Sequence, residues 1–226
     1  MKRPCVLVTG ATGRLGQLLL RHFANDFDLR ATCLNPTALP GVATADLSLV
    51  DQCDLRLFAG VDVVVHCAGQ ASSAASWADV QRHNVDATFN VFETAARAGI
   101  GRVVFMSSNW TMAGYRFGTE ILTEALPPRP TNPYGVSKVV GERIGRGFAD
   151  HRGLSVICLR IGYCGGLAPQ DPRLSKTSWL RHKWLSDRDF LQLVERWRPL
   201  RIGAVVIVAA AGGGKNHERR SQDGRE

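Results

Sequence analysis

PCVLVTGATGRLGQLLLRHFAND, residues 4–26, is the stretch that decides the fold of this chain. Residues 4–10 form a short apolar run that predicts a buried strand, and residues 13–26 carry the periodicity of a helix. Three glycines mark the junction: Gly10, Gly13 and Gly16. Glycines at this spacing allow a tight turn, close approach of a pyrophosphate and close packing of the helix on the strand. The helix N-terminus adds amide donors and a positive dipole end, so the stretch predicts a dinucleotide-binding turn.

The rest of the chain continues the alternation of short apolar runs and helical patterns. Further strands are predicted at 27–34, 61–69, 101–108 and 154–162. Further helices are predicted at 79–99, 134–150 and 184–197, the last capped by Ser186 or Asp187. Strands that alternate with helices of this length predict an α/β fold with a doubly wound, Rossmann-like parallel sheet in a single domain.

The expected domain organisation has three consecutive parts, and two predicted loops lie within them. We expect a dinucleotide-binding domain over 1–165, a partial substrate-binding segment over 166–200, and an atypical basic, partly disordered tail over 201–226. Residues 109–130 and 163–185 lack the strand–helix rhythm and are rich in Pro, Gly and Arg. They are predicted to be loops over the carboxyl ends of the strands, where such folds bind ligands.

Composition narrows the function classes. The 226 residues are 45% hydrophobic and carry a net charge of +8, but residues 196–226 hold seven Lys/Arg against three acids, which is half of that excess. A basic tail is a weaker sign of nucleic-acid binding than a basic face, so no nucleic-acid partner is expected. The basic start reaches a glycine turn too soon for a signal peptide, and the apolar stretch 202–214 is too short to span a bilayer. No membrane partner is expected.

The cysteines and histidines of the chain are not spaced as metal ligands are. The six cysteines form no CxxC pair, and several lie in apolar runs, which favours reduced, buried thiols and a cytoplasmic protein. His66 and His83 have no carboxylate or thiolate at metal spacing, so we interpret them as structural and expect no metal. The tryptophans of the C-terminal part are interpreted as packing residues: Trp179, Trp184 and Trp197.

The segment TNPYGVSKVVGER, residues 131–143, contains a tyrosine and a lysine four positions apart. With Thr131 or Asn132 as cap and a proline next, Tyr134 falls in the first turn of a helix and Lys138 lies one turn further on the same face. Such pairs also occur on many solvated helices. The alternative is a tyrosine whose proton is made available by a neighbouring ammonium.

Five motifs in order raise the second alternative: TGATGRLG (9–16), HCAG (66–69), HNVDATFNVFETA (83–95), MSSN (106–109) and YGVSK (134–138). Together they resemble the extended short-chain dehydrogenase/reductase family, also called the NAD-dependent epimerase/dehydratase family. Within it, MSSNWT, PYGVSKVVGE, LRIGYC and WLSDRDFLQLVE are most similar to the uronate dehydrogenases. The resemblance covers residues 4 to about 195.

The resemblance implies roles for individual residues and NAD or NADP as cofactor. Ser108, Tyr134 and Lys138 match the catalytic serine, tyrosine and lysine. The implied cofactor contacts are Gly10, Thr12, Gly13, Arg14, Leu15, Gly16, Asp46, Leu47, Cys67, Ala68, Gly69, Asn84, Tyr134, Lys138 and Ile161. The implied substrate contacts are Ser72, Ser108, Asn109 and Tyr163.

The chemistry of the matched residues follows from their side chains. A tyrosine with a pKa near 10 is a poor base at neutral pH, but a lysine ammonium and a positively charged nicotinamide ring favour the phenolate. Tyr134 then takes a proton from a substrate hydroxyl while hydride leaves the same carbon. Ser108 would hold the substrate oxygen, and Lys138 would also bond the nicotinamide ribose.

Two departures from the family pattern concern the ligands. Cys33 stands where NAD enzymes usually carry an acid for the ribose 2′-hydroxyl, and Arg14 in the glycine loop is compatible with a 2′-phosphate, so NAD and NADP both stay open. Tyr163 replaces a serine that helps to bind substrate in the uronate enzymes, and the substrate arginine of that group aligns with Arg173 or Arg181.

The C-terminus is the third departure, because RWRPLRIGAVVIVAAAGGG does not match the family's continuation and is consistent with a truncated or frame-shifted end. The leading interpretation is an NAD(P)-dependent oxidoreductase acting on a sugar or sugar acid, with a hexuronate oxidised to its lactone as the sharpest version. A nucleotide-sugar epimerase/dehydratase and a cofactor-binding protein of low activity are the alternatives. By analogy alone, helices 79–99 and 134–150 form the interface of a homodimer.

Overall fold

The computed structural model describes residues 3–118, 122–123, 126–168, 170–172, 174, 181, 183–196 and 205–210. A parallel sheet of seven strands forms its centre, in the order β3-β2-β1-β4-β5-β6-β7. The strands are β1 Cys5–Thr9, β2 Asp28–Cys33, β3 Val42–Thr44, β4 Val63–His66, β5 Arg102–Ser108, β6 Ser155–Ile161 and β7 Val205–Ala210. The order reverses between β1 and β4, which creates a crevice at the carboxyl ends of these two strands.

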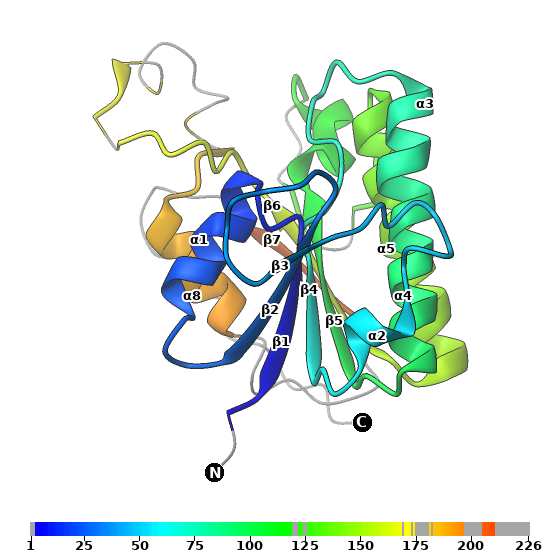
Figure 1. Ribbon diagram of the computed structural model, residues 1–226. Coiled ribbons are helices and arrows are strands. Elements are labelled where there is room, and N and C mark those ends of the chain that lie inside the picture. The colour runs from blue at the N-terminus through cyan, green and yellow to red at the C-terminus, as the bar shows by residue number, and fades with distance from the viewer. Residues whose placement is uncertain are drawn as a thin grey trace, which may run out of the picture.

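Helices cover both faces of the sheet (Figure 1). One face carries α1 Arg14–His22 and α8 Asp187–Glu195, and the other carries α4 Ala87–Arg97 and α5 Pro133–Arg152. The shorter elements are α2 Leu55–Phe58, α3 Trp77–Val80, the π-helical turn η1 Gln81–Asp86 and the 3₁₀ helix η2 Asn109–Tyr115. The predicted doubly wound α/β sheet is therefore confirmed.

The core consists of two apolar layers, one on each side of the sheet. Leu7, Val64 and Phe105 belong to the layer under α4 and α5, whereas Val8 and Val65 belong to the layer under α1 and α8. Adjacent strand residues thus enter opposite layers, and every residue of β1, β4, β5 and β6 is buried. Burial on both faces explains why these strands are continuous apolar runs rather than alternating ones.

The structure differs from the sequence prediction in three elements. Residues 205–210, which we placed in an atypical, partly disordered tail, form strand β7 in register with β6. The sequence VVIVAA is apolar and rich in β-branched residues, which favour strands, and the segment pairs in parallel with β6. The predicted loop 109–130 begins with η2, and the predicted helix 79–99 contains a π-helical turn. The remainder of the tail lies outside the described residues.

Two glycines of α5 provide a matched pair for testing how this helix packs on β5. A Cβ at Gly141 would overlap the ring of Phe105, whereas a Cβ at Gly147 would meet nothing within 4 Å. We expect Gly141→Ala to lower the free energy of unfolding by about 1–3 kcal/mol through overpacking. Gly147→Ala should raise it by about 0.5–1 kcal/mol, because alanine is the better helix former. Urea denaturation of both variants measures the difference, and equal effects would contradict the close α5–β5 contact.

Candidate active site

The glycine-rich turn lies between β1 and α1, at the crevice. Gly10 has φ 70°, and a Cβ there would lie 2.7 Å from the amide nitrogen of Ala68. A Cβ at Gly16 would overlap the carbonyl oxygen of Gly10. Helix α1 begins at Arg14, and its N-cap residue Gly13 offers no side-chain cap, so the first-turn amides face the crevice uncapped. A close backbone cradle beside an uncapped helix N-terminus fits the pyrophosphate of a dinucleotide.

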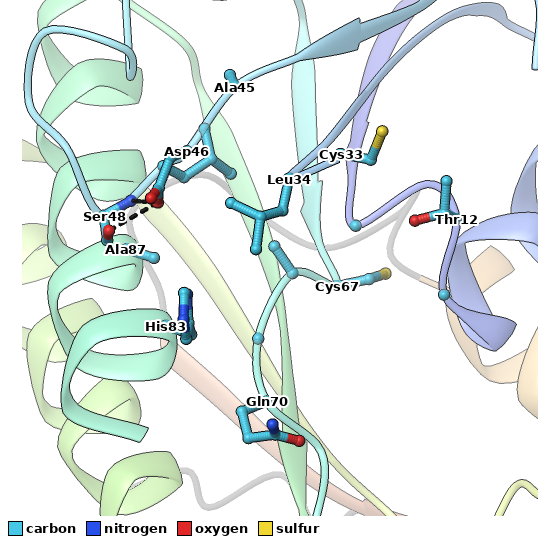
Figure 2. Close-up of a pocket in the computed structure, with 15 residues that line it drawn as sticks. Thr12, Cys33, Leu34, Ala45, Asp46, Ser48, Cys67, Gln70, His83 and Ala87 are labelled. Atoms are coloured by element: carbon cyan, nitrogen blue, oxygen red, sulfur yellow. Dashed lines mark hydrogen bonds between the residues drawn. The ribbon is translucent and has the colours of Figure 1, made fainter. Parts of the chain in front are cut away.

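A cavity of about 330 Å³ opens on one side of this turn (Figure 2). It is lined by eight of the predicted cofactor contacts: Gly10, Thr12, Gly13, Asp46, Leu47, Cys67, Ala68 and Gly69. The other lining residues were not predicted as contacts: Cys33, Leu34, Ala45, Ser48, Gln70, His83 and Ala87. Most of them neighbour predicted contacts in the chain. The crevice position and the lining fit the adenosine half of a dinucleotide.

Asp46 is held by its neighbours at one wall of this cavity. Its carboxylate accepts hydrogen bonds from the backbone and hydroxyl of Ser48, at 3.0 and 2.6 Å, and from Arg82 at 2.7 Å. Burial raises the pKa of Asp46, but these hydrogen bonds outweigh it and the pKa is lowered overall. Asp46 is therefore a fixed, ionised acceptor, as recognition of an adenine amino group requires.

The carboxyl end of β2 carries no acid. Cys33 is buried and donates its thiol hydrogen to the carbonyl of Asn35 at 2.9 Å, and Leu34 is exposed. Arg14 does not reach this end, because its guanidinium donates to both carboxylate oxygens of Asp187, at 2.6 and 2.7 Å, and to the carbonyl of Cys164. That placement removes Arg14 as an argument for a 2′-phosphate.

A second cavity of about 510 Å³ lies on the other side of the glycine turn. The predicted residues that line it are Gly10, Gly13, Arg14, Leu15, Gly16, Cys67, Gly69, Ser108, Asn109, Tyr134, Ile161 and Tyr163. Gly10, Gly13, Cys67 and Gly69 line both cavities. The catalytic tyrosine and serine candidates thus share a wall with the glycine turn, at the carboxyl ends of β5 and β6.

Local sequence explains how Tyr134 reaches that cavity. Asn132 caps α5 by accepting the amide of Gly135 at 2.7 Å, and Pro133 occupies the first turn. The cap prediction of Thr131 or Asn132 is thereby settled in favour of Asn132. Tyr134 is largely buried and lines the second cavity together with Ser108. Burial raises the pKa of Tyr134, and the nearby Ser108 side chain opposes that rise.

Lys138 lies one turn further along α5. Its ammonium is 5.8 Å from the ring centre of Tyr134 and 4.9 Å from that of Phe105, and the residue is only 5% exposed. Burial lowers the pKa of Lys138 to about 8, although the charge of Cys67 opposes this. We expected the ammonium to favour the phenolate, but in the protein alone the burial of Tyr134 dominates its pKa.

Asn84 connects the loop after β4 to α5. Its side-chain oxygen accepts a hydrogen bond from the backbone amide of Gln70 at 2.7 Å. Its side-chain nitrogen donates to the backbone carbonyl of Gln70 at 3.1 Å and to the hydroxyl of Ser137 at 2.8 Å. Ser137 in turn donates to the carbonyl of Tyr134 at 2.8 Å. Asn84 stands in the π-helical turn η1, a feature that often marks functional sites. It orders the wall of the site from within and lines neither cavity.

Several predicted residues lie away from the cavity walls. Lys138, like Asn84, is behind the wall, and Ser72 is exposed, with its hydroxyl accepting the amide of Ala74 at 3.2 Å. Arg181 is exposed and lines neither cavity. The predictions for Arg173, Trp179 and Trp197 fall outside the described residues. Trp184 is half-buried and donates its indole hydrogen to the carbonyl of Leu167 at 3.2 Å, which is a packing role.

Three large side chains of the second cavity were not predicted: Trp110, Arg116 and Lys183. All three stand in the irregular segments that we placed over the carboxyl ends of the strands. The position of these segments indicated that they border the site, but it does not predict which of their side chains point into the cavity.

His66 is fully buried between two threonines. Its ring nitrogens lie 2.7 Å from the hydroxyl of Thr9 and 3.1 Å from that of Thr88. Burial lowers the pKa of His66 to about 3, with a smaller effect of Lys138. Among the described residues no three His, Cys, Asp or Glu side chains gather as a metal site requires. In the same part of the chain, no helix is long and apolar enough to cross a membrane.

The fold and the site together place the chain among the extended short-chain dehydrogenases/reductases. Within that class the chain belongs to the NAD dependent epimerase/dehydratase family, which it matches over residues 6–181. The resemblance noted in the sequence is thus confirmed. The family's dependence on NAD also agrees with the predicted nicotinamide cofactor.

Three relatives show what the chain is similar to. It is 34% identical to an L-arabinose 1-dehydrogenase (NAD(P)(+)) of Haloferax volcanii, over 84% of this chain and 81% of the relative. It is 32% identical to an NAD-dependent glucose-6-phosphate dehydrogenase of the same organism, over 79% and 76%. The crystal structure of uronate dehydrogenase from Agrobacterium tumefaciens superposes with a TM-score of 0.78 at 32% identity, over 93% of this chain and 78% of that one.

Proposed function

We propose that the protein is an NAD(P)-dependent dehydrogenase that oxidises a sugar or sugar acid at a ring hydroxyl, with a hexuronate giving its lactone as the sharpest version. The observation that carries the proposal is the meeting of Ser108 and Tyr134 on the wall that the second cavity shares with the glycine turn. The relatives with which the chain shares about a third of its residues are named as sugar or uronate dehydrogenases.

The residues present divide the work of such a reaction. The glycine turn and the first turn of α1 would hold the pyrophosphate, Asp46 would accept the adenine amino group, and the nicotinamide supplies the hydride acceptor. Tyr134 takes the proton of the substrate hydroxyl at its Oη. Ser108, which lines the same cavity as Tyr134, holds the substrate oxygen at the same point.

Lys138 acts from behind the wall. Its buried ammonium favours the ionised form of Tyr134 once a proton has to leave, because an opposite charge nearby stabilises a phenolate. Asn84 and Ser137 fix the backbone of Tyr134 and so the direction of its hydroxyl. Each of these groups is preorganised by contacts to the scaffold, as a general base requires.

A substrate and cofactor panel tests this proposal. The protein is incubated with NAD or NADP and with uronates, aldoses, sugar phosphates or nucleotide sugars, and the absorbance of the reduced cofactor is followed. We expect reduction with at least one sugar or sugar acid. Both cofactors belong in the panel because β2 ends at Cys33 and Leu34 follows it, without an acid to exclude a 2′-phosphate.

The alternatives give different outcomes in the same panel. Conversion of a nucleotide sugar without net reduction of cofactor would overturn the dehydrogenase in favour of an epimerase or dehydratase. Cofactor binding without conversion of any compound would favour a binding protein of low activity. The homodimer through α4 and α5 stays a prediction.

A further inference from the structure

Helices α1 and α8 contact one another on one face of the sheet and are tied together at both ends (Figure 1). Arg14, the first residue of α1, pairs with Asp187, the first residue of α8. His22, the last residue of α1, lies 2.9 Å from the carboxylate of Glu195, the last residue of α8. The two helices therefore run in the same direction. Their N-terminal pair lies at the second cavity, which Arg14 lines.

The N-terminal pair has a defined geometry but is open to solvent. The guanidinium of Arg14 donates to both carboxylate oxygens of Asp187, at 2.6 and 2.7 Å, and its Nε donates to the carbonyl of Cys164 at 3.0 Å. The side chains of Arg14 and Asp187 are 43% and 41% exposed. Exposed ion pairs contribute little to stability, whereas several charge-assisted hydrogen bonds fix the orientation of a planar guanidinium. These contacts are therefore suited to hold a position rather than to hold the fold together.

The segment that Arg14 holds, residues 163–166, follows the end of β6. Three of its residues line the second cavity: Tyr163, Cys164 and Gly165. A Cβ at Gly166, which has φ 70°, would overlap the guanidinium of Arg14, and a Cβ at Gly165 would overlap the ring of Tyr163. The two glycines thus allow the segment to pack closely against Arg14 and against its own tyrosine.

Arg14 also belongs to the cofactor side of the site. It opens α1, whose first-turn amides face the crevice uncapped, and its neighbours Gly13 and Leu15 line the second cavity with it. The backbone of Arg14 thus lies where a pyrophosphate would bind, while its side chain reaches the wall that contains Tyr163. One residue connects the two parts of the site between which cofactor and substrate would meet.

We propose that Arg14 is a positioning residue: its guanidinium, locked by Asp187, holds the 163–166 segment in place and so preorganises the sugar-side wall against the cofactor turn. The inference rests on the proposed dehydrogenase function and adds to it a residue that acts on the substrate through Tyr163. It also gives a role in substrate binding to Asp187, which lines neither cavity. We call the contacts of Arg14 with Asp187 and Cys164 the Arg14 clamp.

Thiol labelling tests the Arg14 clamp without any turnover. Cys164 is half-buried in the held segment, and its Sγ lies 3.7 Å from the carboxylate of Asp187. Burial raises the pKa of Cys164 to about 11, and the charge of Arg14 opposes that rise. Loss of this charge alone would raise the pKa further and slow alkylation, because the thiolate is the reactive form.

We expect the opposite in Arg14→Met, where iodoacetamide should alkylate Cys164 about 5-fold or more faster than in the wild type. Release of the segment increases the access of the reagent, as local opening does in general. Peptide mass spectrometry measures the rate at Cys164 separately from the other thiols. An unchanged or slower rate would overturn the clamp.

Steady-state kinetics tests the role of Arg14 in substrate binding, with D-glucuronate, L-arabinose and D-glucose 6-phosphate as substrates at saturating NAD. In Arg14→Lys the KM for the best of these sugars should rise about 10-fold, because part of the binding free energy is then spent on ordering the segment. The reacting groups are untouched, so kcat should stay within a few-fold. Lysine keeps the positive charge beside the cofactor but lacks the fork that holds Asp187 and Cys164 together. A wild-type KM in Arg14→Lys would overturn the clamp in favour of a simple charge effect.

Helix α8 supplies a matched pair of variants. Asp187 and Asp189 both stand in its first turn, and Asp189 is exposed. Asp187→Ala should raise the KM as Arg14→Lys does, whereas Asp189→Ala should leave it at the wild-type value. His22→Leu removes the pair at the other end of the two helices and should also leave the KM unchanged. Equal effects of Asp187→Ala and His22→Leu would mean that general docking of α8 on α1 is responsible, which would overturn the clamp.

The two proposals fail in different ways. Turnover of a sugar together with wild-type KM and wild-type Cys164 labelling in the Arg14 variants would overturn the clamp and leave the dehydrogenase standing. Faster labelling of Cys164 in Arg14→Met, with no cofactor reduction by the wild-type protein on any sugar, would overturn the dehydrogenase and leave the clamp standing.

Discussion

Tyr134→Phe should lower kcat with the best sugar substrate by about 10²–10⁴-fold while it changes the dissociation constant of the cofactor only a few-fold. The substitution removes one hydroxyl from a buried side chain whose ring stays packed in the first turn of α5. Tyr134 lines the same cavity as Ser108, and its hydroxyl is the group that we propose takes the substrate proton. Steady-state kinetics and calorimetric titration of the cofactor measure the two quantities.

Tyr115 offers the matched control for this substitution. Its hydroxyl donates to the carbonyl of Pro127 at 3.0 Å, and the residue lines neither cavity. Tyr115→Phe should keep kcat within a few-fold of the wild-type value. Unchanged turnover in Tyr134→Phe, or an equal loss in both variants, would exclude Tyr134 as the base.

Local sequence determines the geometry of two parts of the candidate site. The glycine turn needs only a strand, three glycines and a helix, all within residues 4–26. Tyr134 and Lys138 are oriented by a cap, a proline and the pitch of one helix. In both cases residues close in the chain determine the orientation of the glycine turn or of the side chains. The spacing of these residues in the sequence therefore predicts the local geometry.

Long-range contacts determine the parts that sequence reasoning missed. Arg14 turns toward Asp187, 173 positions away, and no local pattern indicates that partner. Lys183 reaches the cavity because its backbone pairs with Tyr163. Strand β7 pairs in parallel with β6, a long-range contact that the short apolar run 205–210 does not indicate by itself. Each outcome is a tertiary effect that overrides a weak local signal.

The second large effect that we expect is a loss of stability, and it concerns a buried ion pair behind the site. Arg160 on β6 donates to both carboxylate oxygens of Glu142 on α5, at 2.8 and 2.7 Å, and Ser107 on β5 donates to the same carboxylate at 2.6 Å. The arginine side chain is 6% exposed and the glutamate side chain 4%. The pair raises the pKa of Arg160. One carboxylate therefore joins α5, β5 and β6 in the interior.

Glu142→Leu should lower the free energy of unfolding by about 3–5 kcal/mol, because it leaves the guanidinium of Arg160 buried without its partner charge. Urea denaturation measures this loss. The double variant Glu142→Leu/Arg160→Leu should recover most of it, since no uncompensated charge then remains. Asp150→Asn is the control on the same helix, because its pair with Arg146 is exposed and should contribute less than about 1 kcal/mol.

The same pair should affect catalysis through position. Glu142 lies one turn beyond Lys138 on α5, and Ser107 is adjacent to Ser108, so the carboxylate holds the helix of the tyrosine against the strand of the serine. In the double variant we expect stability to return further than kcat, because leucines replace the charge but not the hydrogen bond to Ser107. Full recovery of kcat together with stability would show that packing alone sets the distance between Tyr134 and Ser108. A loss below about 1 kcal/mol in Glu142→Leu would contradict the buried pair itself.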